Sequence, residues 1–329
     1  MLRTAIIENP HDLQRIRPLW EEFPRCGGMT MFQGYAWNAI AMHVFREREM
    51  PRFVYVESDA GVALVPCVIG KDCGVIHLAG ERMFDYRDVL LAGDESLLAR
   101  AWATISDWDL EFESKALYGE EAGEKWSALP VRFFANAPRV NHSAIAAEEF
   151  LKAHNRMGRF SRRFQRQGIT LHKHSGSNQA LIRTIYDRKA SQEVPTNLFR
   201  DPLRREFMAA IAAQPEAHCE VFTYESAGEL VAALVTFRDG DVRRFYTTYF
   251  DRRWASQSPG QVLLYEITAQ SLRDNLDCDY MTGEYPYKNR FATGVVSLYG
   301  VKATSAQLRV AAAQALKRQP DPLHEPLVA

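Results

Sequence analysis

The stretch that decides the fold runs from residue 258 to residue 291 and reads SPGQVLLYEITAQSLRDNLDCDYMTGEYPYKNRF. After the opening Pro-Gly turn, apolar residues recur at helical spacing, so we predict a helix that begins near Pro259. The short run Cys278–Met281 then predicts a strand that ends just before Gly283. A compact cluster of acidic, aromatic and basic residues follows this strand.

This order of loop, helix, strand and polar cluster is typical of a ligand site. The first N–H groups of a helix have no partner within the helix, and together with the helix dipole they attract anions. Ligands of α/β proteins tend to bind beyond the carboxyl ends of the strands. We therefore expect the functional site of this protein between Ser258 and Phe291.

The composition is that of an ordinary globular protein. Hydrophobic residues make up 47% and charged residues 25% of the chain, which excludes wholesale disorder and a fibrous class. The 40 Lys and Arg residues nearly balance the 41 Asp and Glu residues, which argues against a protein devoted to nucleic acid and leaves room for a local basic patch. A length of 329 residues predicts about two domains.

Neither a disulfide framework nor a metal site is expected. The cysteines are odd in number and lack C-x-x-C spacing; they are Cys26, Cys67, Cys73, Cys219 and Cys278. No uncharged run approaches the roughly 18 residues of a membrane span, and Glu8, Asn9 and Pro10 interrupt the apolar run at the start. We expect a cytoplasmic protein, with peripheral contact to the inner face of the membrane as an open alternative.

The first half alternates helical and strand patterns. It predicts strands at residues 4–8, 52–58, 61–70 and 74–80 and helices after Pro10 and around residues 33–46. Asp59, Ala60 and Gly61 predict a hairpin turn between two of these strands. His77 is expected in the core of its strand, and a charged segment, residues 81–88, follows it.

The second half repeats this pattern. It predicts a long helix over residues 144–168, a strand at 169–174, helices near 179–192 and 202–213, a meander over 219–226, 228–240 and 241–250, and closing strands at 295–301 and 306–312. The shared order indicates a structural duplication. We predict an α/β protein (α+β mixed sheets) with domains at 1–142 and 143–318 and a flexible tail at 319–329. No Gly/Ser/Pro-rich spacer separates the halves, so a packed interface is expected.

Four stretches carry a resemblance to a known family. They are Phe32-Gln33 with Trp37, Val62–Pro66 with Asp85–Asp88, Asp201–Phe207, and Tyr249–Lys288 with its SPG, Asp279, Gly283 and Pro286-Tyr287-Lys288. The sequence resembles the tandem GNAT-type acyltransferases associated with bacterial cellulose and exopolysaccharide biosynthesis, and is more distantly similar to the Fem-type aminoacyl transferases. The resemblance implies two tandem GNAT-like folds, with the acyl-donor site in the second and the acceptor side in the first.

Two features depart from the family pattern. The family usually places an acidic pair between the Gly and the Pro, whereas this chain has Glu284 followed by Tyr285. The phosphate loop carries only Gly260, and Pro259 contributes no N–H group. These departures weaken the expected grip on coenzyme A and leave open a donor carried on a protein or on tRNA.

The donor site is predicted at the start of the helix after SPG. Ser258, Gly260 and Gln261 would contact the donor, with the N–H groups of Gly260 and Gln261 facing a pyrophosphate, and Arg252 or Arg253 would add positive charge. The alternative is a plain capped helix, with Ser258 as the N-cap and Pro259 in the first turn.

The catalytic candidates lie in the cluster after Gly283. Glu284 would act as general base, Tyr287 would protonate the departing thiolate, and Lys288 would neutralise donor phosphate. The alternative is an i,i+4 salt bridge between Glu284 and Lys288 beside a Tyr287 that only packs. Asp279 lies in an apolar strand and is expected to be a structural hydrogen-bond partner rather than a base.

The acceptor would meet Tyr285, Asp85, Asp88, Arg159 and Arg163. The two arginines belong to a basic stripe with helical spacing, which would contact an anionic acceptor, tRNA or a lipid head group. The residues of this basic stripe are Lys152, Arg156, Arg159, Arg163 and Arg166. The alternatives are a solvated helix face for this stripe and surface salt bridges for residues 81–88. His172 and His174 share one face of a strand, but they lack a third ligand for a metal.

We expect an enzyme that moves an acyl group from acyl-CoA or an acyl carrier protein to an amine or hydroxyl of a sugar, an amino-acid derivative or a lipid amine. The expected route is direct attack in a ternary complex, because no cysteine lies in the site cluster. Two alternatives remain open: aminoacyl transfer from charged tRNA, and a non-catalytic accessory protein of envelope polysaccharide synthesis. No metal and no DNA partner are expected.

Overall fold

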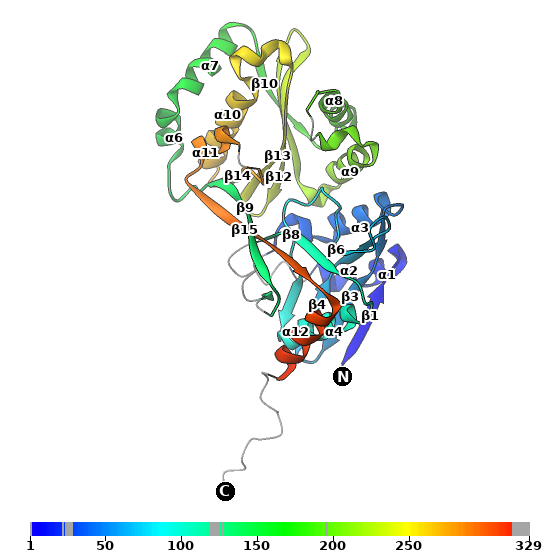
Figure 1. The fold of residues 1–329 in the computed structure, drawn as a ribbon. Helices are drawn as coiled ribbons and strands as arrows, with labels where there is room; N and C mark the ends of the chain where they lie inside the picture. Colours follow the sequence, from blue (N-terminus) through cyan, green and yellow to red (C-terminus); the bar gives the residue numbers. More distant parts are fainter. Residues whose placement is uncertain are drawn as a thin grey trace. The chain divides into compact units, whose positions relative to one another are not determined.

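The computed structural model describes residues 2–21, 23, 29–118, 125–126, 128–194, 197–283 and 285–317. The chain forms two compact units, one of Met1–Phe134 with Ser297–Ala329 and the other of Ala135–Val296 (Figure 1). The expected domains, 1–142 and 143–318, differ from these units chiefly because the residues after 296 join the first unit. The expected tail, 319–329, lies outside the described residues.

One part of the first unit is a four-stranded antiparallel sheet. Its order is β1 (Arg3–Ile7), β3 (Phe53–Ser58), β4 (Gly61–Val65) and β7 (Leu90–Gly93). The predicted hairpin is confirmed, because Ser58 pairs with Gly61 across the turn. Gly61 has φ +132°, and a Cβ there would lie 2.0 Å from the Ala92 carbonyl oxygen, so this turn requires glycine.

A second group of strands completes the first unit's sheets. Its order is β15 (Gly294–Ala303), β8 (Phe112–Tyr118), β6 (Ile76–Leu78), β5 (Cys67–Gly70) and β2 (Glu49–Pro51). The pairs β15–β8, β6–β5 and β5–β2 are antiparallel, and β6 pairs with β8 in parallel. Residues 298–303 of β15 pair with β8 of the first unit. For this reason the chain after residue 296 belongs to the first unit.

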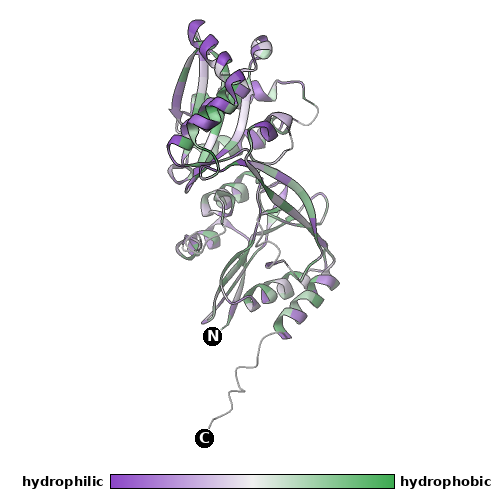
Figure 2. Cartoon of the chain, turned by 90° about the vertical axis from the view of Figure 1, so that its left-hand side faces the viewer, coloured by the Kyte–Doolittle hydropathy of each residue, from purple (hydrophilic) through white to green (hydrophobic). Residues whose placement is uncertain are grey.

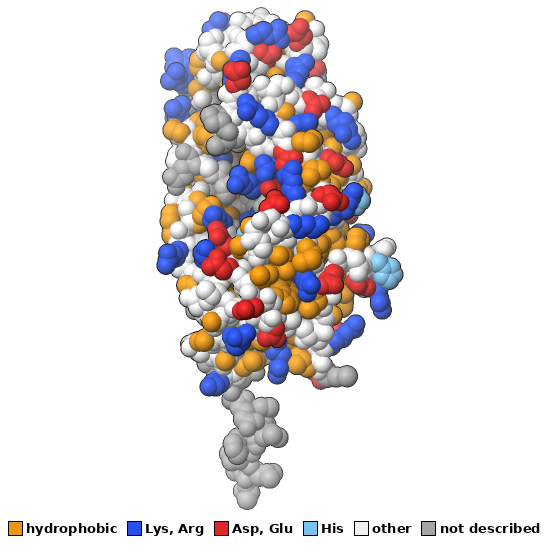
Figure 3. Space-filling model, turned by 45° about the vertical axis from the view of Figure 1, so that its right-hand side comes forward, with side chains coloured by type: hydrophobic (Ala, Val, Ile, Leu, Met, Phe, Trp, Pro, Cys, Tyr) orange, Lys and Arg blue, Asp and Glu red, His pale blue; other side chains and the backbone are white. Residues whose placement is uncertain are grey.

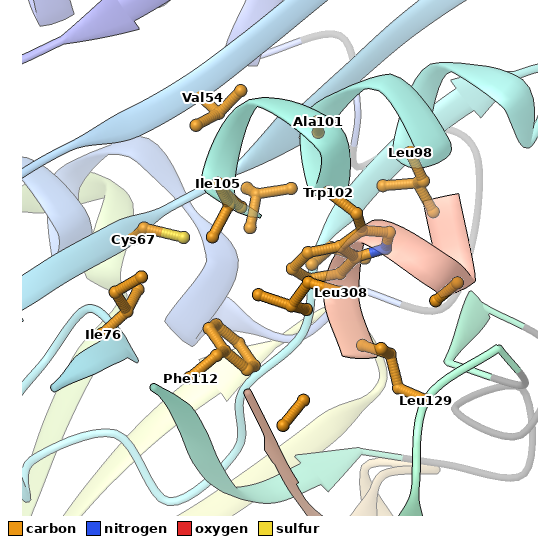
Figure 4. Packing of buried hydrophobic residues seen from close by; sticks show 14 of the residues in the cluster. Val54, Cys67, Ile76, Leu98, Ala101, Trp102, Ile105, Phe112, Leu129 and Leu308 are labelled. Carbon is orange, nitrogen blue, oxygen red and sulfur yellow. The ribbon is translucent and has the colours of Figure 1, made fainter. Parts of the chain in front are cut away.

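Helices cover these strands. They are α1 (Pro10–Arg15), α2 (Arg17–Trp20), α3 (Tyr35–Val44), α4 (Ser96–Ser106) and α12 (Ser305–Lys317). Trp102 of α4 and Leu308 of α12 meet Phe112 of β8 in the buried core (Figure 4). The strand predicted at 306–312 is wrong. Leu308, Ala311 and Ala312 are the buried residues there, and their spacing is that of one helix face.

The second unit is built on a mixed sheet. Its order is β10 (Thr170–Ser175), β11 (Cys219–Ser226), β12 (Glu229–Asp239), β13 (Val242–Phe250), β14 (Asp277–Asp279) and the end of β9 (Val131–Val140). The predicted meander β11–β12–β13 is confirmed. β13 and β14 run parallel, whereas the other neighbouring pairs described in this sheet are antiparallel. The α10 helix (Pro259–Arg273) provides the crossover that parallel pairing requires.

Helices lie on both faces of this sheet (Figure 1). One side carries α6 (Ala147–Ala153), α7 (Asn155–Arg166), α10 and α11 (Pro286–Phe291); the other carries α8 (Gln179–Ala190) and α9 (Pro202–Ala212). The single long helix predicted over 144–168 is divided at His154, whose φ and ψ are −107° and 31°. In Figure 2, which views the molecule from the side of α6 and α7, many residues of these helices have hydrophilic colours.

Candidate active site

The candidate site lies where β13 and β14 diverge. The two strands pair only over Val242–Arg244 and Asp277–Asp279. The chain then turns toward β9, because the Tyr280 N–H donates to the Pro138 carbonyl at 3.0 Å. Beyond Arg244, the edge of β13 that faced β14 has no ladder partner among the described residues. Free backbone groups along such an edge can bind a ligand.

A buried ion network holds the strands together at the point of divergence. The Asp279 carboxylate is fully buried and accepts hydrogen bonds from Arg244 Nη1 at 2.5 Å and Arg139 Nη2 at 3.2 Å. It also accepts the Met281 N–H at 2.8 Å. The expectation that Asp279 is a structural partner rather than a base is therefore confirmed.

The β13 strand also contains a bulge. Thr236 of β12 pairs with Phe245 and Val235 pairs with Thr247, so Tyr246 has no opposite residue. A bulge turns the local side chains and increases strand twist, and bulges are frequent near functional sites. Here the bulge lies directly after the last residue of β13 that pairs with β14.

The N-terminus of α10 lies against the far end of β13. Ser258 has φ 51° and makes no side-chain capping bond; instead, its carbonyl accepts the N–H groups of Gln261 at 3.0 Å and Val262 at 3.1 Å. Ser258 is thus the N-cap residue and Pro259 lies in the first turn, as the capped-helix alternative predicts, but the Ser258 hydroxyl makes no capping bond. The Gly260 N–H has no protein acceptor in the described part of the chain. A Cβ at Gly260 would lie 3.1 Å from Thr248 Cγ2, so glycine permits this close packing.

The two predicted arginines differ in availability. Arg253 binds both carboxylate oxygens of Asp251 and also Glu229 Oε2 at 2.9 Å, and the Asp251 carboxylate chiefly raises the pKa of this arginine. Arg252 is exposed and donates to the Glu193 carbonyl at 3.2 Å. Arg252 is thus the cation better placed to move toward an anion.

The polar cluster after β14 is only partly described, because Glu284 lies outside the described residues. Lys288 is buried, and its ammonium donates to the Thr282 carbonyl at 2.6 Å. The rings of Tyr285 and Tyr287 stack with centroids 5.8 Å apart. Tyr285 is exposed, whereas burial raises the pKa of Tyr287 to about 12.

Lys189 is a further site residue that the sequence did not reveal. It lies in the last turn of α8, and its Nζ donates to the Thr248 carbonyl of β13 at 2.6 Å. Burial, assisted by the nearby charge of Lys288, lowers the pKa of Lys189 to about 8. Cationic residues are common in the last turn of any helix, so nothing in the sequence distinguished this one.

Two of the predicted acceptor residues, Asp85 and Asp88, belong to the first unit. Asp88 is buried within the first unit, where its carboxylate binds Lys125 Nζ at 2.9 Å, Trp126 Nε1 at 3.0 Å and the Val89 N–H at 2.8 Å. Burial raises the pKa of Asp88, and Lys125 opposes this shift. These three bonds occupy the Asp88 carboxylate within its own unit, and its contact with the acceptor stays a prediction. Asp85 is half-buried in the same unit.

The basic stripe forms the outer side of α7. Arg159 and Arg163 are exposed, while Met157 and Phe164 are buried against the unit's core, so the predicted amphipathic character is confirmed. On the face drawn in Figure 3, by contrast, acidic and basic side chains are interspersed. The described residues contain no group of three or more His, Cys, Asp or Glu side chains that would hold a metal ion.

We predict that Asp279→Ala lowers the free energy of unfolding of the second unit by about 3–5 kcal/mol, because Arg139 and Arg244 lose the buried carboxylate between them. Chemical denaturation followed by circular dichroism measures this loss. The matched control is Glu148→Ala, which removes the exposed pair with Arg273 and is expected to cost about 0–1 kcal/mol. Equal effects of the two substitutions would contradict the structural role of Asp279.

We predict a distinct pH dependence for Lys189. Its pKa is about 8 in the folded protein and 10.5 in its ordinary state, so between these values the unfolded chain binds more protons. The stability of the wild type relative to Lys189→Met therefore rises with pH between about 8 and 10 and is flat below pH 7. Denaturation of both proteins at pH 6 to 10 measures the difference, and a constant difference would contradict the lowered pKa.

Among the described residues, no helix is both long and apolar enough to cross a membrane.

Residues 152–289 match the family model of the acetyltransferase (GNAT) domain. No curated protein matches the chain in sequence.

Several solved structures share the fold. L-PGS from Bacillus licheniformis is 13% identical with TM-score 0.57, over 95% of this chain and 98% of that chain. FemX is 10% identical with TM-score 0.57, over 90% and 96%. A tandem GNAT protein from the clavulanic acid biosynthesis pathway is 9% identical with TM-score 0.52, over 93% and 99%. Residues 152–289 thus match a GNAT acetyltransferase domain, and the chain has a two-domain GNAT-like fold.

Proposed function

We propose that the second unit transfers an acyl group from an acyl thioester to an amine or hydroxyl acceptor. The observation that carries the proposal is the divergence of β13 from β14 beside the α10 N-terminus, within the segment that matches the GNAT domain. The open strand edge and the helix end offer binding groups for the two parts of a thioester donor. The donor is acyl-CoA or an acylated carrier protein, and the acceptor is a sugar, an amino-acid derivative or a lipid amine.

The phosphates of the donor would bind at the start of α10. The Gly260 N–H is available for an anion, and the exposed Arg252 would supply a charge-assisted hydrogen bond. Gln261 contributes less than expected, because its N–H already donates to Ser258. Arg253 is held by Asp251 and Glu229. The proposed phosphate site therefore offers few binding groups, as expected for a loop with a single glycine.

The thioester carbonyl would lie along the open edge of β13. Backbone N–H groups of this edge are fixed in place by the pairing with β12, so they can stabilise the developing oxyanion without reorganising. The acceptor nitrogen or oxygen attacks the carbonyl carbon, the new C–N or C–O bond forms, and the C–S bond breaks. One proton leaves the acceptor and one proton reaches the thiolate.

Two groups at the site have pKa values that suit different roles. Tyr287, with a pKa of about 12, is a weaker acid than a thiol of pKa about 8.5, so it would donate a hydrogen bond to the departing sulfur rather than its proton. Lys189, with a pKa of about 8, is matched to proton exchange near neutral pH. We keep Glu284 as the proposed general base, and Tyr285 as a contact for the acceptor.

Calorimetry with acetyl-CoA, long-chain acyl-CoA and free coenzyme A tests donor binding. We predict binding of all three, with the affinity lowered about threefold to tenfold in Arg252→Ala, because one charge-assisted hydrogen bond is lost. Arg273→Ala, at the opposite end of α10, is the matched control and should bind like the wild type. Absence of heat with every donor would contradict acyl-CoA use and favour the alternatives.

Release of the coenzyme A thiol in the presence of a panel of amines tests the chemistry. We predict that Glu284→Gln lowers the rate by about 10²-fold or more, as loss of a general base does, and that Tyr287→Phe has a smaller effect. Glu206→Gln, on α9, is the matched control for the charge change. Full activity in both Glu284→Gln and Tyr287→Phe would remove their proposed roles.

Aminoacyl transfer from charged tRNA is the second candidate. It is favoured by the exposed arginines of α7 and by the fold shared with FemX. Under this hypothesis, neutralising Arg159 and Arg163 reduces the salt dependence of tRNA binding. Each arginine–phosphate contact releases counterions from the tRNA, and the variant makes fewer such contacts. A non-catalytic accessory protein would instead bind neither acyl-CoA nor charged tRNA.

A further inference from the structure

The first unit contains a polar pocket that the proposed transfer reaction does not use. Its volume is about 350 Å³, and its walls come from β2, β5, β6, β8 and the loop after β6. Four cationic and four acidic side chains line it. This balance of charge favours a small ligand with little net charge over a polyanion such as a nucleotide.

Glu49 of β2 is the most deeply buried carboxylate of the pocket. Its side chain accepts the Glu81 N–H at 3.0 Å through Oε1, whereas Oε2 is buried without a hydrogen-bond partner in the described structure. Burial raises the pKa of Glu49 to about 7, which the charge of Arg87 only partly offsets. A buried carboxylate oxygen without a partner is costly and rare, so it indicates a missing donor.

Arg87 offers the complementary group in the same pocket. Its Nη2 donates to the Glu81 carbonyl, while its Nε is buried without an acceptor among the described residues. No ion pair joins Glu49 and Arg87 in the part of the first unit that the structure describes. The pocket therefore holds one unsatisfied acceptor and one unsatisfied donor, and they do not satisfy each other.

A thiol and an imidazole also line the pocket. His77 Nδ1 lies 2.8 Å from the Glu113 carbonyl oxygen, so this nitrogen carries a proton and Nε2 is left as an acceptor in the neutral ring. Nε2 is 3.7 Å from Cys73 Sγ, and Cys73 is exposed. His77 is thus a pocket residue, which corrects its expected place in the core. The Cys73 thiol provides a chemical reporter for occupancy of the pocket.

We propose that this pocket binds a small molecule with an ammonium group next to an oxygen acceptor. The ammonium donates to Glu49 Oε2 and supplies the hydrogen-bond donor that this oxygen lacks, and the oxygen accepts from Arg87 Nε. An amino acid offers this chemistry through its carboxylate, and an amino sugar through a neighbouring hydroxyl. The proposal stands whether or not the second unit transfers acyl groups, because it concerns binding alone.

Protection of Cys73 from iodoacetamide, measured by peptide mass spectrometry on the full chain, tests the proposal. The probes are L-serine and D-glucosamine, each paired with its counterpart without the amine, L-lactate and D-glucose. We expect at least one amine to slow labelling fivefold or more at saturation, and both counterparts to leave it unchanged. Protection by serine alone assigns an amino acid, and protection by glucosamine alone assigns an amino sugar.

Glu49→Gln supplies the variant test. Glutamine keeps the acceptor for the Glu81 N–H and loses the charge, so the concentration of amine needed for half protection should rise at least tenfold. Glu95→Gln, an exposed residue at the start of α4, is the matched control and should behave like the wild type. If Glu49→Gln fails to fold, the wild-type comparison still decides. Equal protection by an amine and its counterpart, or none by any probe, would overturn the proposal.

Discussion

The second unit depends on one buried carboxylate. Asp279 is fully buried between Arg139 and Arg244, and so joins β14 to both of its neighbours. Two buried guanidinium groups without this carboxylate would be strongly unfavourable, so the three strands must meet at this register. Since β14 ends at Asp279, the network also fixes the residue at which β13 loses its neighbour and the open edge of the candidate site begins.

The N-terminus of α10 and the last turn of α8 both reach the β13 strand near its open edge. Gly260 lets the α10 helix approach Thr248, and Lys189 reaches the Thr248 carbonyl from α8. A helix N-terminus and a lysine of lowered pKa thus reach the same β13 residue. Burying Lys189 lowers the free energy of unfolding at neutral pH. Residues at functional sites commonly have shifted pKa values of this kind.

Much of this organisation was predictable from local sequence signals. The alternating apolar residues of the meander, the turn at Gly61 and the isolated acid Asp279 each have a local physical cause, and the structure confirmed them. The break at His154 and the helical form of residues 305–317 were not predicted, because packing against the core decided them. Lys189 and the Glu49–Arg87 pocket were also missed, since side chains far apart in the chain create them.

The return of the chain to the first unit sets the order in which the protein can fold during synthesis. Core residues Val301, Ala303 and Leu308 pack with strands and helices made more than a hundred residues earlier, so the first unit lacks part of its core until they emerge from the ribosome. The second unit, residues 135–296, is complete before that moment. The inserted unit is therefore synthesised completely before the core of the first unit can be completed by β15 and α12.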